Sequence, residues 1–235
     1  MNLILLDEGD FVAPGRARLT GRRLAHVRTV HRAAAGDQLV VGLLDGDLGA
    51  GVVTQIDESV VELAVTLDAP PPPRAEVLLL LALPRPKALR RILQHLSALG
   101  VDQIVLLNAY RVEKSFWSSP VLSADSIDAA LRLGLEQARD TRRPSVRLER
   151  RFKPFVEDSL PQLAAGRRCL LAHPHRAAPC PHNVSGPLAL AVGPEGGWID
   201  FERGLLEAAG FDAVSLGPRI LRTESALSVL LGRLL

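Results

Sequence analysis

Hydrophobic and polar positions follow different patterns on the two sides of a four-proline run at residues 70–73. Before the run, short β-branched segments separated by turn sequences are typical of hairpin-linked strands, which we expect at 38–43, 51–56 and 60–67. A short helix is expected over 20–33, where Leu24 and Val27 share a face. The prolines can continue neither a strand nor a helix, so they mark a domain boundary. Residues 1–70 are therefore predicted to form a small β-barrel.

After the prolines, apolar runs of strand length alternate with amphipathic helical segments. The continuous apolar run at 77–83 is typical of a strand covered on both faces. Helices are expected over 87–99, where Gly100 follows as the terminating residue, and over 126–139. Further short strands are expected at 101–107, 169–172, 188–192 and 213–216. Strands that alternate with helices predict a parallel α/β sheet within a second domain over 71–235.

Two glycine-rich turns stand close together near the end of the chain. The first is Gly193-Pro194-Glu195-Gly196-Gly197, and the second begins at Leu216-Gly217-Pro218; each follows a short apolar strand. Such junctions present backbone N–H and C=O groups to a ligand at the carboxyl edge of a sheet. The first turn contains one acid and no base, so it is a poor phosphate cradle and favours a neutral or cationic ligand. A plain strand-to-helix turn without a ligand is the alternative.

Several classes of protein are disfavoured by what the sequence lacks. Neither G-x-G-x-x-G after a strand nor G-x-x-x-x-G-K-[ST] occurs, which argues against dinucleotide and P-loop chemistry. The apolar runs are short of a membrane span, the N-terminus lacks a secretory signal, and two cysteines do not suggest a disulfide framework. We therefore expect a cytoplasmic protein without a membrane partner.

The net charge is only +2, but all except three of the 28 basic residues are Arg. Residues 11–36 contain six Arg and no acid. Arg suits bidentate phosphate contact and base stacking, so this stretch favours a nucleic-acid surface, with ordinary solvated cations as the alternative. Residues 111–117 combine basic and aromatic side chains after a strand end, which suits a splayed-out RNA base or simply a loop with a half-buried Trp. The RNA-binding candidates are Arg16, Arg18, Arg28, Arg32, Arg111 and Lys114.

A cluster at His173, His175, Cys180 and His182 contains enough ligands for zinc. It has no Cys-x2-Cys pair, however, and three prolines interrupt it. We therefore expect no metal site, and we expect His173 to line a ligand-binding loop.

The two turns resemble a known family. The sequence GPEGG followed by Trp198 and Glu202, and the sequence LGPRILRTESA from Leu216 to Ala226, are similar to two motifs of the SPOUT class of S-adenosylmethionine-dependent RNA methyltransferases. Within that class they resemble the family that methylates N3 of a uridine in 16S ribosomal RNA. Departures from that family's usual residues are Ile199, Lys87, Arg90, His95, Ala98 and Asp140.

The resemblance implies an α/β SPOUT methyltransferase domain with a C-terminal trefoil knot, preceded by a small PUA-like RNA-binding β-barrel. It implies S-adenosylmethionine as cofactor, 16S ribosomal RNA or the assembled small ribosomal subunit as partner, and a homodimer. The cofactor-binding candidates are Leu171, His173, Gly193, Pro194, Gly196, Leu216, Gly217, Ile220 and Leu221. A different RNA target, such as transfer RNA or a ribose 2′-OH, and a non-catalytic RNA-binding module are the alternatives.

The reaction suggests roles for three charged residues. Uridine N3 carries a proton at neutral pH, so negative charge develops on the base as that proton is lost. Arg222 is the candidate that stabilises this charge. Glu224 and Glu195 are candidates for accepting the proton or orienting the base. Glu224 also stands at an expected helix start, where an acid complements the helix dipole without any catalytic role.

Overall fold

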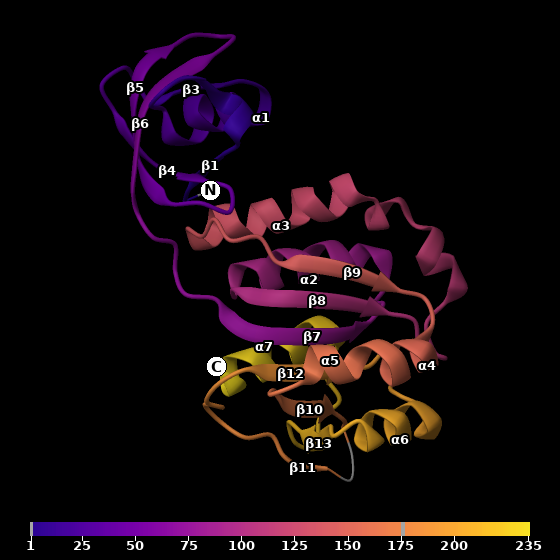
Figure 1. Ribbon diagram of the computed structural model, residues 1–235. Helices are drawn as coiled ribbons and strands as arrows, with labels where there is room; N and C mark the ends of the chain where they lie inside the picture. Colours follow the sequence, from indigo (N-terminus) through magenta and orange to yellow (C-terminus); the bar gives the residue numbers. More distant parts are fainter. Residues whose placement is uncertain (1, 175–176) are drawn as a thin grey trace. The chain divides into compact units, whose positions relative to one another are not determined.

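The computed structural model describes residues 2–174 and 177–235 (Figure 1). Two compact units divide the chain. The first unit comprises residues 1–73 together with 131–143, and the second comprises 74–130 together with 144–235. The sequence analysis had assigned residues 131–143 to the second domain. The helix α3, Ala124–Ala138, thus begins in one unit and ends in the other.

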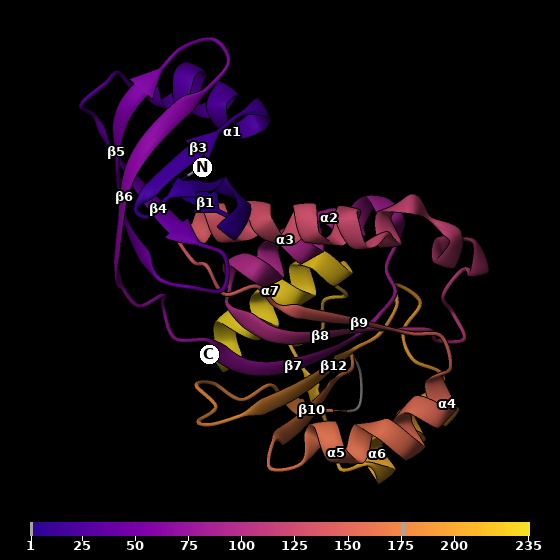
Figure 2. The same ribbon diagram turned by 45° about the horizontal axis from the view of Figure 1, so that its top comes forward.

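A mixed six-stranded sheet forms the first unit, in the order β1-β4-β5-β6-β3-β2. The strands are β1 Ile4–Leu6, β2 Phe11–Ala13, β3 Arg16–Leu19, β4 Gln38–Leu43, β5 Leu48–Ile56 and β6 Val61–Ala69. The helix α1, Gly21–His26, continues as the π-helical turn η2, Val27–His31. The helix α1 lies beside the strands of this sheet (Figure 2). Leu24 and Val27 from the helical segment are buried in one hydrophobic cluster with side chains of the sheet. The predicted helix and three predicted strands are confirmed.

Three short strands of the first unit, β1, β2 and β3, were not expected. They span only three or four residues each, too few for a period-two pattern to show. A 3-10 turn, η1 at Glu8–Asp10, separates the first two. Residues 131–143 attach to this unit through backbone and side-chain bonds: the Leu3 amide donates to the Glu136 carbonyl at 3.1 Å, and Arg132 pairs with Asp7 at 2.8 Å.

The second unit is built on a seven-stranded sheet whose neighbouring strands all run parallel, in the order β11-β13-β10-β12-β7-β8-β9. The strands are β7 Ala75–Ala82, β8 Val101–Leu107, β9 Ser145–Glu149, β10 Arg168–Ala172, β11 Ala178–Pro179, β12 Leu188–Val192 and β13 Asp212–Ser215. Residues of β7 and β12 at the centre are almost entirely buried, as their continuous apolar runs require. The predicted parallel α/β sheet is confirmed.

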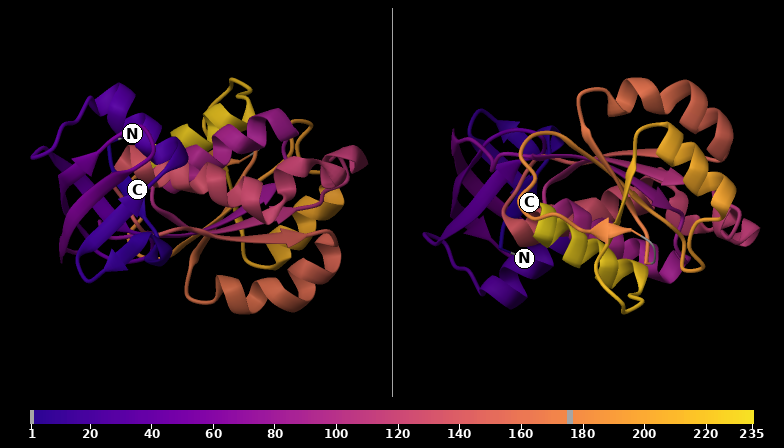
Figure 3. Two further views of the ribbon diagram at one scale, coloured as in Figure 1. Left: turned by 90° about the horizontal axis from the view of Figure 1, so that it is seen from above. Right: turned by 90° about the horizontal axis from the view of Figure 1, so that it is seen from below.

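Helices cover both faces of this sheet (Figure 3). α2, Pro86–Ala98, and α7, Thr223–Leu234, pack together on one face, while α5, Leu160–Ala164, and α6, Asp200–Ala208, lie on the other. The short helical pieces are η3 Lys114–Ser118, η4 Pro120–Leu122, α4 Phe152–Pro154 and the π-helical η5 Phe155–Ser159. Among the described residues, no helix is both long and apolar enough to cross a bilayer.

Candidate functional site

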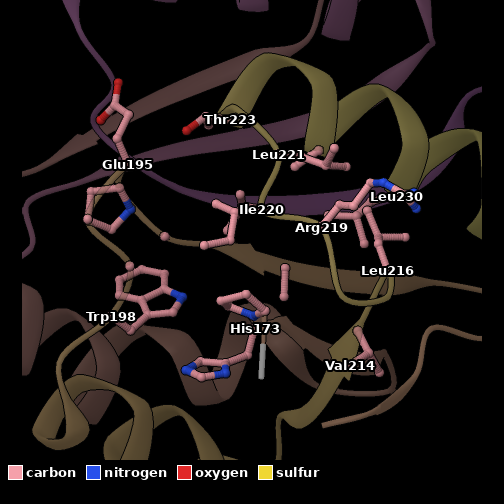
Figure 4. A pocket seen from close by; sticks show the side chains of 18 of the residues that line it. His173, Glu195, Trp198, Val214, Leu216, Arg219, Ile220, Leu221, Thr223 and Leu230 are labelled. Carbon is pink, nitrogen blue, oxygen red and sulfur yellow. The ribbon is translucent and has the colours of Figure 1, made fainter. Parts of the chain in front are cut away.

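The carboxyl ends of β10, β12 and β13 lie side by side, since β10 pairs with both of the other strands. The loops that leave these strands enclose a cavity of about 380 Å³, a size typical of small-molecule sites (Figure 4). Both glycine-rich turns contribute to it, as does the loop after β10. Its lining includes Ala172, His173, Pro174, Val192, Trp198, Val214, Thr223, Ala226 and Leu230 in addition to residues 193–197, 216–217 and 219–221.

The first glycine-rich turn is closed by a hydrogen bond from the Gly197 amide to the Pro194 carbonyl at 2.7 Å. Gly197 has a φ of 74°, in the left-handed region that favours glycine. Gly196 lies under the side chain of Arg111: a Cβ at Gly196 would stand 3.0 Å from Arg111 Cδ, and the Arg111 guanidinium donates to the Gly196 carbonyl. The left-handed backbone of the turn therefore favours glycine at Gly197, and glycine at Gly196 leaves room for the Arg111 side chain.

The loop after β10 and the loop after β13 are joined by hydrogen bonds. The His173 amide donates to the Val214 carbonyl at 2.9 Å, which continues the pairing of β10 with β13 into the cavity wall. The Ser215 hydroxyl accepts from the Gly217 amide at 3.1 Å and lies 3.3 Å from the Pro174 carbonyl, to which it donates. Gly217 has a φ of 111°. These bonds hold backbone groups of both loops in fixed positions around the cavity.

Trp198 closes one side of the cavity and has a buried, unsatisfied donor. Its indole Nε1 has no hydrogen-bond partner among the described residues and faces the interior of the ring of lining side chains (Figure 4). A Cβ at Gly193 would stand 3.1 Å from this nitrogen, so glycine leaves room beside it. A buried N–H without a partner costs on the order of 1–3 kcal/mol. The cavity therefore offers a hydrogen bond that a ligand acceptor can complete.

Glu202 links the loop after β8 to the start of α6, next to the first glycine-rich turn. Its carboxylate, almost fully buried, accepts from the Tyr110 amide at 2.7 Å and from the Ile199 amide at 3.2 Å. Ile199 is the N-cap of α6 and forms no side-chain cap hydrogen bond, and Asp200 is already helical. Glu202 instead reaches back from the first turn to the Ile199 amide.

Arg222 and Glu224 line a second cavity, of about 460 Å³, which we call the basic cavity. Its other lining residues are Arg85, Lys87, Ala88, Arg91 and His95. Glu195 connects the two cavities: it lines the first, and its carboxylate accepts from the Arg85 amide at 3.4 Å. The three candidate catalytic residues thus lie around the boundary between a mainly apolar cavity and a cationic one.

The candidate cofactor-binding residues line the first cavity, with one exception. Leu171 is fully buried in β10, and Ala172, the next residue, reaches the cavity. The sequence analysis missed Ala226 and Leu230, which recur with Thr223 on one face of α7 at helical spacing. That spacing was the available signal for them. The sequence analysis also did not place Arg111 at this cavity, because it assigned Arg111 to RNA binding.

The remaining candidates are scattered. Arg16 and Arg18 both pair with Glu62, whereas Arg28 and Arg32 line a shallow hollow beside Asp57 and Glu58. Lys114 is exposed at the start of η3. His175, part of the considered zinc cluster, lies outside the described residues. Within residues 2–174 and 177–235, no group of three or more His, Cys, Asp or Glu side chains could hold a metal ion.

Comparisons with known proteins show the family to which this chain belongs. Residues 70–235 match the model of the RNA methyltransferase domain family. A ribosomal RNA small subunit methyltransferase E from Treponema pallidum is 31% identical over 96% of this chain and 87% of its own. That from Mycobacterium bovis is also 31% identical, over 88% of this chain and 81% of its own. The chain belongs to the ribosomal RNA small subunit methyltransferase E family.

Solved structures share the fold of this methyltransferase. The family member from Neisseria gonorrhoeae, bound to S-adenosyl methionine, superposes with a TM-score of 0.76 at 23% identity, covering 98% of this chain and 95% of its own. A Legionella pneumophila protein described as a methyltransferase, in complex with S-adenosylmethionine, gives a TM-score of 0.72 at 25% identity, covering 97% of this chain and 96% of its own.

Proposed function

We propose that this RNA methyltransferase transfers a methyl group from S-adenosylmethionine to N3 of a uridine in small-subunit ribosomal RNA. One observation carries the proposal: a cavity with an unsatisfied indole donor adjoins a cationic cavity through Glu195, Arg222 and Glu224. A donor site and an acceptor site must adjoin in this way for direct methyl transfer. The names of the similar proteins support the choice of donor and of RNA.

The first cavity suits the cofactor. Its apolar lining fits an adenosyl group, and the backbone of its loops supplies hydrogen-bonding groups. Trp198 Nε1 can donate a hydrogen bond to an acceptor on the ligand. His173, Gly193, Pro194, Gly196, Leu216, Gly217, Ile220 and Leu221 would hold the cofactor, with Leu171 supporting the loop from within β10. When bound, S-adenosylmethionine supplies an electrophilic methyl group on a sulfonium centre.

Three side chains would serve the acceptor base. The Arg222 guanidinium, exposed at the start of α7, stabilises the negative charge that develops on the uracil oxygens as N3 loses its proton. Glu195 lines the first cavity and Glu224 lines the basic cavity, and either carboxylate can accept the N3 proton or hold the base in orientation. Arg111, held over the first turn by the Gly196 carbonyl, and Lys114 lie on the strand-end loop proposed to contact RNA.

We further propose that residues 1–70 act as a PUA-like RNA-binding domain and that the C-terminal segment forms a trefoil knot. Support for the knot comes from the non-sequential order of β10, β12 and β13, and from Asn183 and Val184, whose amides donate to carbonyls at the end of α7. The homodimer and the cytoplasmic location remain proposals that follow from the family and from a ribosomal RNA substrate.

Two measurements test the function. Calorimetry should detect S-adenosylmethionine binding to the wild-type protein, and Trp198→Phe should weaken it about fivefold, the worth of one hydrogen bond. An absence of binding at millimolar cofactor would contradict a methyltransferase. Mass mapping of small-subunit ribosomal RNA should then show a uridine that loses its N3-methyl group when the gene is deleted. Unchanged methylation in the deletion strain would contradict the proposed target.

A further inference from the structure

The basic cavity gathers more positive charge than its surroundings neutralise. Arg85, Lys87, Arg91 and Arg222 all line it, against the single carboxylate of Glu224. Within the described part of the chain, none of these four cations forms an ion pair. Four like charges around one hollow repel each other, so the arrangement favours an anionic ligand.

Two helices begin at the same cavity and add to its positive potential. Arg85 is the N-cap of α2 and Arg222 is the N-cap of α7, and neither supplies a side-chain hydrogen bond to its helix. The first turn of α2 contains no acid, although an acid there would stabilise the helix. By contrast, the first turn of α6 contains both Asp200 and Glu202. The cations at the start of α2 thus oppose helix stability, which indicates another role.

The identity of the anion follows from what lies next to the cavity. The sequence Arg222-Thr223-Glu224 passes from the basic cavity into the first cavity and back, and Glu195 contacts the Arg85 amide across the boundary. A base held at this boundary would carry its own backbone phosphates into the basic cavity. Arg and Lys are the side chains that most often contact nucleic-acid phosphates, and such contacts fix the register of the strand.

We propose that the basic cavity binds a phosphodiester group of the RNA strand that carries the accepting base, and so positions that base beside the first cavity. This rests on the proposed function. Arg85, Lys87 and Arg91 are the lining cations that have no assigned role in the reaction, and Lys87 and Arg91 are the two of them that lie within α2. They lie one helical turn apart on α2, so both can contact one phosphate group.

The test compares Lys87→Gln and Arg91→Gln with a matched control, Arg90→Gln. Arg90 is exposed on the same helix and loses the same charge, but it does not line the cavity. Gln retains helix propensity close to that of Lys and Arg, so the fold should be kept. The substrate is small ribosomal subunits isolated from a deletion strain, assayed with labelled S-adenosylmethionine.

Each cavity variant should raise the KM for subunits about five- to tenfold, while the KM for S-adenosylmethionine stays within twofold and Arg90→Gln resembles the wild type. RNA affinity should also lose salt dependence, by roughly 0.7 to 0.9 in the log–log slope per phosphate contact removed. Equal increases in the subunit KM for all three variants would show that only the general surface charge matters, and would overturn the proposal.

Other outcomes separate this proposal from the proposed function. Failure of the wild-type protein to methylate subunits would contradict the function itself. Methylation by the wild type with an unchanged KM in both cavity variants would overturn only the phosphodiester site. If inorganic phosphate at about 10 mM raised the Tm of the wild type but not of Lys87→Gln, with subunit KM unchanged, the cavity would bind a free anion and the RNA assignment would be wrong.

Discussion

Each of the two units contains a group of basic side chains, but among the described residues these side chains are mostly ion-paired in the first unit and unpaired around the basic cavity of the second. In the first unit, Arg16 and Arg18 pair with Glu62 at 2.8 and 2.7 Å, and Arg23 pairs with Asp10 at 2.5 Å. In the second unit, the cations of the basic cavity form no ion pairs with the described residues. Most of the arginines in the Arg-rich stretch of the first unit are therefore ion-paired, whereas, in the part of the chain that the structure describes, the four cations that line the basic cavity are not.

Strand pairing explains this reversal. Residues 11–36 contain no acid, yet β3 pairs antiparallel with β6, which sets Arg18 directly opposite Glu62. Cross-strand neighbours of opposite charge stabilise a sheet. Arg22 similarly reaches Glu136, which lies more than a hundred residues away and is almost fully buried. Absence of acids within a stretch thus says little about its partners in space.

The largest expected effect is on catalysis in the second unit. Arg222→Ala should lower kcat by roughly 10²- to 10³-fold, because a donor that stabilises developing charge is lost, while S-adenosylmethionine affinity stays within a few-fold. Single-turnover methylation and calorimetry measure the two quantities. Arg222→Lys serves as the control and should recover part of the rate. Equal losses of rate and cofactor affinity would show that Arg222 shapes the loops instead.

The next effect concerns stability in the first unit. Arg22→Ala should lower the free energy of unfolding by about 2–3 kcal/mol, because it leaves the buried Glu136 carboxylate without its bidentate partner. Urea unfolding measures this loss. The double variant Arg22→Ala/Glu136→Gln should be more stable than Arg22→Ala alone, since no unpaired buried charge remains. A single variant as stable as the wild type would mean that this pair is no part of the scaffold.

A smaller effect separates paired from unpaired arginines in the first unit. Arg28 lines a shallow hollow and forms no ion pair within the described residues, whereas Arg18 is bound to Glu62. Arg28→Gln should therefore weaken RNA binding about threefold to fivefold, while Arg18→Gln should change it less than twofold. Filter binding to small-subunit ribosomal RNA measures both. A larger loss of RNA affinity for Arg18→Gln than for Arg28→Gln would indicate that the paired arginines form the RNA-binding surface.

Much of the second unit could be predicted because its signals are local. The buried runs at β7 and β12 and the stripe of α2 are visible in single windows of sequence. The glycine-rich turns likewise indicated a ligand site, since a turn that needs positive φ and close approach has few alternatives to glycine. Strand β9 was missed because only one of its five residues, Val146, is β-branched, and none is fully buried.

The basic cavity and the first unit's boundary could not be predicted in the same way. Arg85, Lys87 and Arg91 meet Arg222 only because α2 and α7 pack together, and no local pattern reports that contact. The attachment of residues 131–143 to the first unit likewise depends on bonds from residues near the N-terminus. Charge clusters and domain limits that depend on contacts between distant segments can be predicted only once the fold is known.

The smallest expected effect is a pH dependence that probes the scaffold role of Glu62. Hydrogen bonds from Arg18 and then Arg16 lower the pKa of this carboxyl below its ordinary value of 4.5. The folded chain then binds fewer protons than the unfolded chain, so the stabilisation is complete above about pH 4.5 and is lost as the pH falls through the lowered pKa. Glu62→Gln should therefore melt below the wild type at pH 7, and the gap in Tm should narrow below pH 4.5. Glu58→Gln, an exposed control on the same hairpin, should show little gap at either pH; a constant gap for Glu62→Gln would mean that its charge does not stabilise the sheet.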